Sequence, residues 1–137
     1  PQSGQSLLSL EESNPHSSVP PALQVAEDGV TGDIKKDMIK ELFYHDCSDE
    51  DVAFAIAHQH AQALAPLATP VIVTDENFGS VPRYYIVLTE DRAIHPDMQR
   101  QMIAASPCKE VFEIASSHSP FYSKTAELVE TLQKISV

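Results

Sequence analysis

The sequence has only two cysteines, Cys47 and Cys108, and no tryptophan among its 137 residues. Two cysteines are too few for the disulfide framework of small secreted domains, so both are interpreted as thiols, and a reducing, cytoplasmic setting is expected. The chain also lacks any apolar run close to the roughly 18 residues that a membrane-spanning helix requires. We therefore expect a protein with no membrane segment.

Basic residues are scarce, with 9 Lys and Arg against 20 Asp and Glu and a net charge of −11. Nucleic-acid binding requires clusters of Lys and Arg, so nucleic acid is not expected as a partner. The acidic excess lies almost wholly in residues 1–80, where 13 acids and 3 bases give −10, whereas residues 81–137 have 7 acids and 6 bases, giving −1. A solvated surface explains the excess, and the break near residue 80 indicates two sub-regions.

The N-terminus, residues 1–5, lacks an initiating methionine and the basic and apolar regions of a signal peptide. We therefore expect the chain to be the interior of a longer protein, exposed by cleavage or by the choice of the expressed segment. Its length fits one ordinary domain, and its content of 42% hydrophobic and 21% charged residues is typical of globular proteins.

The first part of the chain, residues 1–78, is predicted to be mostly helical and to lack a sheet. Its one strand signal is a short hairpin around Asp28-Gly29, and Ser48 followed by three acids predicts a helix N-terminus. The predicted elements are a short helix at residues 6–12, hairpin strands at 23–25 and 30–32, a helix at 35–44, a helix from 48 to about 60 and a short piece ending near Pro66.

The second part, residues 79–137, is predicted to alternate strand, helix, strand, helix. The run RYYIVL at 83–88 suits a strand buried on both faces, and VFEIA at 111–115 a second strand. Pro96 is expected to open a helix through about residue 105, and Ser123 to cap a final helix. This order implies a parallel sheet of the α/β class, and two strands are too few to stand alone, so they should complete a larger sheet.

Two polar residues stand in the loops after the predicted strands. Asp91 lies after the first strand and His118 after the second, and function in open α/β sheets gathers at the carboxyl ends of strands. An acid followed by a histidine matches the late part of the chain order Ser…Asp…His of α/β hydrolases. On spacing alone, a turn-forming Asp and a surface His would be the better interpretation.

Several ordered motifs, however, resemble the plant methylesterase and hydroxynitrile lyase family and its bacterial esterase relatives. FYHDCSDEDVA (43–53) is similar to the family's cap segment, TDENFGSVPR (74–83) to the return from cap to core, and YIVLTEDRAI (85–94) to the strand and loop that hold the triad acid. The Ser-His at 117–118, before a terminal helix, is where the family keeps its catalytic histidine. The resemblance covers the chain from about residue 42, and more loosely from residue 1.

The resemblance implies the C-terminal part of an α/β-hydrolase fold, with residues 1–78 as cap and residues 79–137 as core. It implies a serine esterase in which His118 is the base, Asp91 orients it, and no cofactor takes part. The family's Gly-x-Ser-x-Gly nucleophile motif and oxyanion loop do not occur in this chain. The expected partner is therefore an N-terminal half, and this chain alone is expected to be inactive.

The alternatives differ in reaction type. The family's lyases keep a lysine next to the histidine region, where this chain has Ser119, and this favours ester hydrolysis over cyanohydrin cleavage. A hydroxynitrile lyase-type C–C lyase stays open as a second enzymatic interpretation, and a non-catalytic fragment or binding relative as a third.

Ile94 and Phe121 flank the two triad positions and are candidate substrate-pocket residues, with core packing as the open alternative. Phe43 and Tyr44 are assigned to packing, and His95 to the start of a helix.

Histidines also suggest a metal site, which the spacing disfavours. His58 and His60 are two positions apart and would point in different directions on a helix, and His45 and Cys47 do not complete a zinc-like pattern. No metal ligand is assigned.

Overall fold

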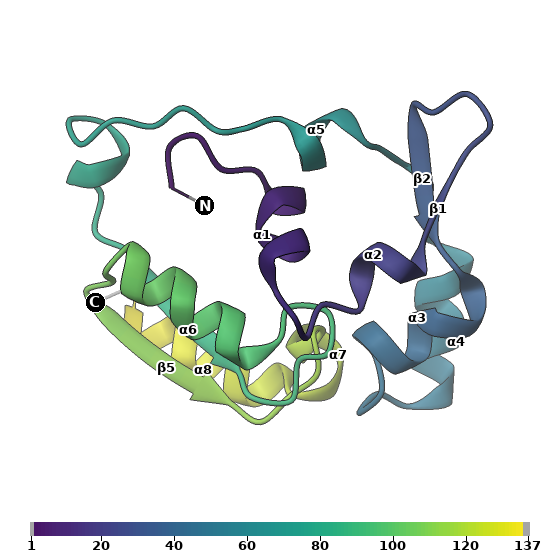
Figure 1. Cartoon of the computed structure of the whole chain (residues 1–137). Coiled ribbons are helices and arrows are strands. Elements are labelled where there is room, and N and C mark those ends of the chain that lie inside the picture. Colours follow the sequence, from purple (N-terminus) through teal and green to yellow (C-terminus); the bar gives the residue numbers. More distant parts are fainter. Residues whose placement is uncertain (1, 136–137) are drawn as a thin grey trace.

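The computed structural model of the chain describes residues 2–135 (Figure 1). Within these residues, no helix is long and apolar enough to span a membrane. The elements are α1 (Leu7–Ser13), α2 (Val19–Ala22), β1 (Leu23–Val25), β2 (Thr31–Ile34), α3 (Lys36–Phe43), α4 (Asp49–Ala57), β3 (Gln62–Ala63), α5 (Ala65–Ala68), η1 (Phe78–Ser80), β4 (Tyr84–Leu88), α6 (Pro96–Ala105), β5 (Glu110–Ile114), α7 (Pro120–Ser123) and α8 (Thr125–Ile135).

The second part of the chain forms the predicted parallel pair of strands. β4 and β5 run parallel, in a register from Tyr84 opposite Glu110 to Leu88 opposite Ile114. Val87 and Ile114 are each only 1% exposed and lie in the core between sheet and helices. The predicted order of strand, helix, strand and helix is confirmed.

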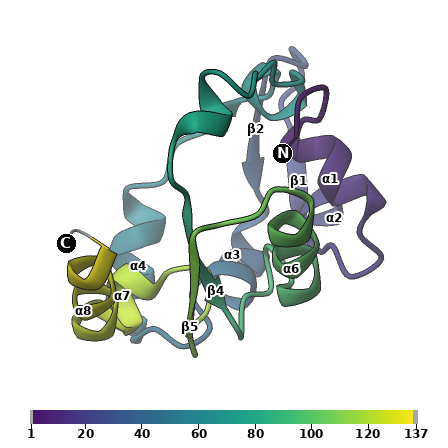
Figure 2. The same cartoon turned by 90° about the vertical axis from the view of Figure 1, so that its left-hand side faces the viewer.

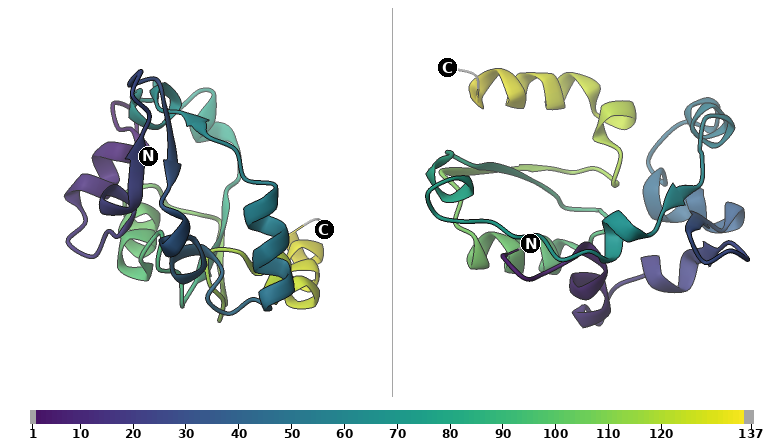
Figure 3. Two further views of the ribbon diagram at one scale, coloured as in Figure 1. Left: turned by 90° about the vertical axis from the view of Figure 1, so that its right-hand side faces the viewer. Right: turned by 90° about the horizontal axis from the view of Figure 1, so that it is seen from above.

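Helices cover both faces of this pair. Figure 2 and the right-hand panel of Figure 3 show α6 on one face and α8 on the other, and α6 contacts β4 while α8 contacts β5. Pro96 opens α6 as predicted, and the His95 ring accepts the Asp97 amide at 3.3 Å, which confirms its helix-start role.

The first part contains a small sheet, so the prediction of a sheet-free region was wrong. β1 and β2 pair antiparallel around Asp28-Gly29, where Gly29 has a φ of 68°, and β3 adds to the other edge of β2. β3 is only two residues long, which is too short for an alternating pattern of apolar and polar residues. It forms because the edge of β2 offers unpaired backbone groups.

The next two helices form near their predicted positions. Ile39 and Leu42 are the buried side chains of α3. Ser48 caps α4 by accepting the Asp51 amide at 3.1 Å and donating its hydroxyl to the Asp51 carboxylate at 2.6 Å. α4 ends at Ala57, before the predicted end at about residue 60, because the chain leaves helical geometry at His58.

The start of the last helical region differs from the prediction. A separate short helix, α7, begins at Pro120, and α8 begins only at Thr125 after a break at Lys124, whose φ and ψ are −131° and 38°. Because proline suits a first helical position, the turn forms directly after Ser119. Ser123 therefore ends α7 and does not cap α8.

Candidate active site

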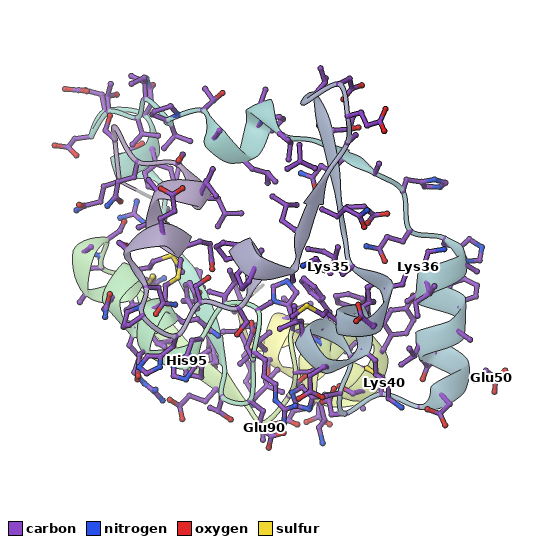
Figure 4. All side chains as sticks on the ribbon, turned by 45° about the vertical axis from the view of Figure 1, so that its right-hand side comes forward. Lys35, Lys36, Lys40, Glu50, Glu90 and His95 are labelled. Carbon is purple, nitrogen blue, oxygen red and sulfur yellow. The ribbon has the colours of Figure 1, made fainter. Side chains whose placement is uncertain are left out.

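Asp91 and His118 lie side by side at the carboxyl edge of the parallel strands. β4 ends at Leu88 and β5 at Ile114, so the loops that follow emerge at the same edge; Glu90, labelled in Figure 4, marks the first of them. The Nδ1 atom of His118 lies 2.9 Å from Oδ2 of Asp91, across 27 positions of sequence. The Asp91 side chain is 2% exposed and that of His118 is 38% exposed.

The Asp91 carboxylate is fixed by its own loop. Its Oδ1 atom accepts the amides of Ala93 and Ile94 at 2.8 and 2.9 Å. The buried Gln99 side chain donates to the carbonyls of Leu88 and Ile94 at 3.1 and 2.7 Å and accepts the Leu88 amide at 3.0 Å. This side chain ties the loop that presents Asp91 to α6, and nothing in the sequence singled it out.

The His118 ring is oriented for proton transfer. With Nδ1 directed at Asp91, the Nε2 atom is left with no hydrogen-bond partner among residues 2–135. The Phe43 ring meets the imidazole edge-on, with centroids 5.3 Å apart and planes at 82°. An imidazole held in this way can accept a proton at Nε2 while the carboxylate stabilises the resulting charge at Nδ1.

The segment between α3 and α4 holds both of these loops. The Asp46 carboxylate accepts the Ser117 amide at 3.0 Å, and the Ser117 hydroxyl donates to the Phe43 carbonyl at 3.0 Å. The His45 ring contacts the Glu90 carbonyl at 2.9 Å, one residue before Asp91. The segment therefore contacts the residue before each member of the pair.

The charge state of Asp46 follows from these contacts. Burial raises the pKa of its carboxyl, but the polar side chains of Ser117 and Ser123 and the hydrogen bond from the Ser117 amide outweigh burial and lower the pKa to about 2. Burial and the neighbouring Asp46 raise the pKa of the Cys47 thiol, which makes it a poor nucleophile.

A cavity of about 530 Å³ opens beside His118. Its walls come from α1, the β1–β2 hairpin, α3 and the Asp91 loop, and are mainly apolar. Ile94 lines it, as do Phe43 and Tyr44, which sequence reasoning assigned to packing alone. Phe121 lies outside the lining, is 56% exposed and contacts the Tyr122 ring at a tilt of 51°, with centroids 5.1 Å apart, so its pocket role stays a prediction.

Metal-binding side chains do not cluster in the part of the chain that is described. Residues 2–135 contain no group of three or more His, Cys, Asp or Glu side chains placed to hold an ion. His58 instead directs its Nδ1 atom to the Phe54 carbonyl at 2.8 Å, at the C-terminal end of α4.

A parallel β–α–β unit with a hydrogen-bonded acid and histidine at its carboxyl edge defines a class: the α/β proteins with a hydrolase-type acid–base pair. The profile of the "Alpha/beta hydrolase family" matches residues 7–131. The chain belongs to the α/β-hydrolase family.

Named relatives refine the comparison. The chain is 48% identical over 64 residues to methylesterase 9 of Arabidopsis thaliana, covering 46% of this chain and 25% of that protein. It is 31% identical over 108 residues to methylesterase 17 of the same plant, covering 76% and 39%. Tomato methylketone synthase I, solved with 2-tridecanone, superposes with a TM-score of 0.74 at 30% identity, covering 83% of this chain and 48% of that one. The chain thus spans about a quarter to two-fifths of its curated relatives.

Proposed function

We propose that this chain supplies the acid and base of a serine carboxylic-ester hydrolase. The nucleophilic serine and the oxyanion-hole amides would come from an N-terminal half, either a separate chain or the preceding part of the same one. We call this complete assembly the intact protein. The observation that carries the proposal is the 2.9 Å contact between His118 and the buried Asp91 beside a mainly apolar cavity.

The reaction would proceed through an acyl-enzyme. Nε2 of His118 takes the proton of the serine hydroxyl as the serine oxygen bonds to the ester carbon. The bond from that carbon to the alkoxy oxygen then breaks, and His118 gives its proton to the leaving alcohol. A water molecule repeats the sequence, losing its proton to His118 and releasing the acid and the free serine. Asp91 stabilises the imidazolium in both halves.

The substrate would be an ester with an apolar body. The cavity walls include Leu8, Leu23, Ile39, Phe43 and Ile94, which offer no partner to a charged chain. Two relatives are named methylesterases, and the tomato structure holds a long-chain ketone, which supports a methyl ester of an apolar acid.

Ester hydrolysis is preferred over C–C lysis because the position after His118 is Ser119, which is 1% exposed and carries no charge to stabilise released cyanide. A cytoplasmic location is also part of the proposal. The names of methylesterases 11 to 15 of Arabidopsis thaliana include the word "chloroplastic", which describes the location of those proteins.

Substrate assays separate the three interpretations. The intact protein should hydrolyse methyl octanoate and leave mandelonitrile uncleaved, and the H118A variant should lose the hydrolysis. Cleavage of mandelonitrile without ester hydrolysis would establish the lyase interpretation. An H118A variant that is as active as the wild type would remove His118 from the mechanism. The isolated 137-residue chain should be inactive in both assays.

A further inference from the structure

Glu11, on α1, is a buried carboxyl that the proposed triad does not use. The residue is only 3% exposed. Its Oε2 atom accepts the Ser17 hydroxyl, but Oε1 is buried with no hydrogen-bond partner among residues 2–135. A buried carboxyl oxygen without a donor is unfavourable, so its presence calls for a partner that the described chain does not provide.

The position of Glu11 indicates where that partner would lie. Glu11 lines the cavity that His118 also lines, next to the apolar Leu7 and Leu8 of its own helix. The pKa of Glu11 is raised above its ordinary value, because burial and the charge of Asp91 outweigh the lowering effects of the Ser17 hydrogen bond and of His118. The carboxyl is therefore within electrostatic reach of the triad pair and inside the proposed substrate site.

We propose that Glu11 is a specificity-determining residue whose Oε1 atom accepts a hydrogen bond from a hydroxyl or amino group on the ester bound in the cavity. This inference rests on the proposed function and names its substrate class: esters with an apolar body that carries one hydrogen-bond donor. Ser17 has the supporting role of holding Oε2, which fixes the carboxyl and leaves Oε1 as the free acceptor.

A donor fits this site better than an acceptor does. The negative charge of Asp91 acts at Glu11, and Asp33 is a further acid on the cavity wall, so the local potential favours the positive end of a ligand dipole. Specificity of this kind is large because an analogue without the donor leaves the buried acceptor unpaired.

Matched esters test the inference on the intact protein. Methyl octanoate is compared with methyl 3-hydroxyoctanoate, methyl 8-hydroxyoctanoate and methyl 8-aminooctanoate, in wild type and in E11L, E11Q and E12L. Glu12 is the exposed neighbour on α1, so E12L is the matched control. Wild type and E12L should prefer at least one donor ester by about tenfold in kcat/KM. E11L should reduce that ratio to about one, whatever its absolute rate on methyl octanoate.

The variant E11Q separates the two donor sources. Glutamine has no charge, so a preference for the amino ester should disappear in E11Q, whereas a preference for a hydroxyl ester should survive in part. E11Q also replaces E11L as the test variant if E11L does not give a native circular dichroism spectrum. Equal kcat/KM for all four esters in wild type, or an unchanged preference in E11L, would overturn the role of Glu11.

Failure of the proposed function gives a different result, which is no hydrolysis of any ester. In that case, NMR titrations that measure the binding of 1,8-octanediol and of 1-octanol test the inference independently of catalysis. About tenfold tighter binding of the diol, lost in E11L, would support it, and equal binding of the two alcohols would overturn it.

Discussion

The carboxylate of Asp46 accepts the backbone amide of Ser117, the residue directly before His118, at 3.0 Å and across 71 positions of sequence. The same segment contacts the loop of Asp91 through His45 and the Glu90 carbonyl. The spacing of the acid–base pair is therefore set partly by a connection between α3 and α4, outside the two strands that present the pair.

Replacing Asp46 by alanine should lower activity without removing a reacting group. The Ser117 amide would lose its acceptor, the loop that presents His118 would shift, and kcat should fall about 10- to 100-fold with little change in KM. Unfolding free energy should fall by about 1–3 kcal/mol. Steady-state kinetics and urea unfolding of the intact protein measure both effects.

The control for that substitution is E50Q. Glu50 lies nearby in the sequence, in the first turn of α4, and Figure 4 shows it at the outer end of that helix, pointing away from the molecule. It should leave both quantities unchanged. A D46A protein with wild-type kcat would show that the Asp46 contact does not position His118.

Acid should weaken the fold through Asp46. Its pKa in the folded state is about 2, below the ordinary value of 3.8, so the charged carboxylate stabilises the fold fully above about pH 4. That contribution is lost as pH falls from about 4 through 2. Unfolding free energies of wild type and D46N should therefore converge over this interval, and parallel curves would contradict the assignment.

Tyr85 should titrate well above the ordinary tyrosine pKa of 10.0. Burial raises the pKa of its phenol to about 12, and the charges of Asp91 and Cys108 add to the effect. The folded state favours the neutral phenol, so the contribution of Tyr85 to the free energy of unfolding is complete below pH 10 and is lost as pH rises through 12. Tyrosinate absorbance should show a late step that is missing in Y85F, and an unchanged late step in Y85F would reassign it.

Local signals in the sequence predicted the elements that local chemistry determines. The apolar run of β4, Pro96 at the start of α6 and Ser48 at the start of α4 each specify their structure within a few residues. Asp91 and His118 were predicted because each lies in the loop after a strand and because the motifs resemble a family. β3 and α7 were missed, since the first depends on pairing with β2 and the second on proline placed directly after the His118 loop.

Contacts between distant segments were outside the reach of sequence patterns. Asp46 and Ser117 are 71 positions apart, and Gln99 binds the β4 loop from the middle of α6. Glu11 looked like an ordinary helix-face acid, and only the fold buries it beside the cavity. Sequence reasoning therefore paired Asp91 with His118, which the fold brings together, but missed the residues that hold this pair and line the cavity beside it.

Asn in place of Asp91 should abolish most activity while preserving the fold. The amide can still contact His118, but it cannot stabilise the imidazolium or enforce the tautomer with Nε2 free, so kcat should fall about 10⁴-fold. Kinetics on methyl octanoate measure this, with circular dichroism as the check on folding. A loss below tenfold would show that Asp91 is not the acid of the triad.

The most direct test of the whole account is the site and rate of labelling of the intact protein by a fluorophosphonate, read by intact mass and peptide mapping. Such a reagent reports a serine activated by a base. The account predicts one labelled serine outside these 137 residues, with labelling slowed by orders of magnitude in H118A. A labelled serine within this chain, or undiminished labelling in H118A, would contradict the claim that Asp91 and His118 serve a serine supplied from the N-terminal half.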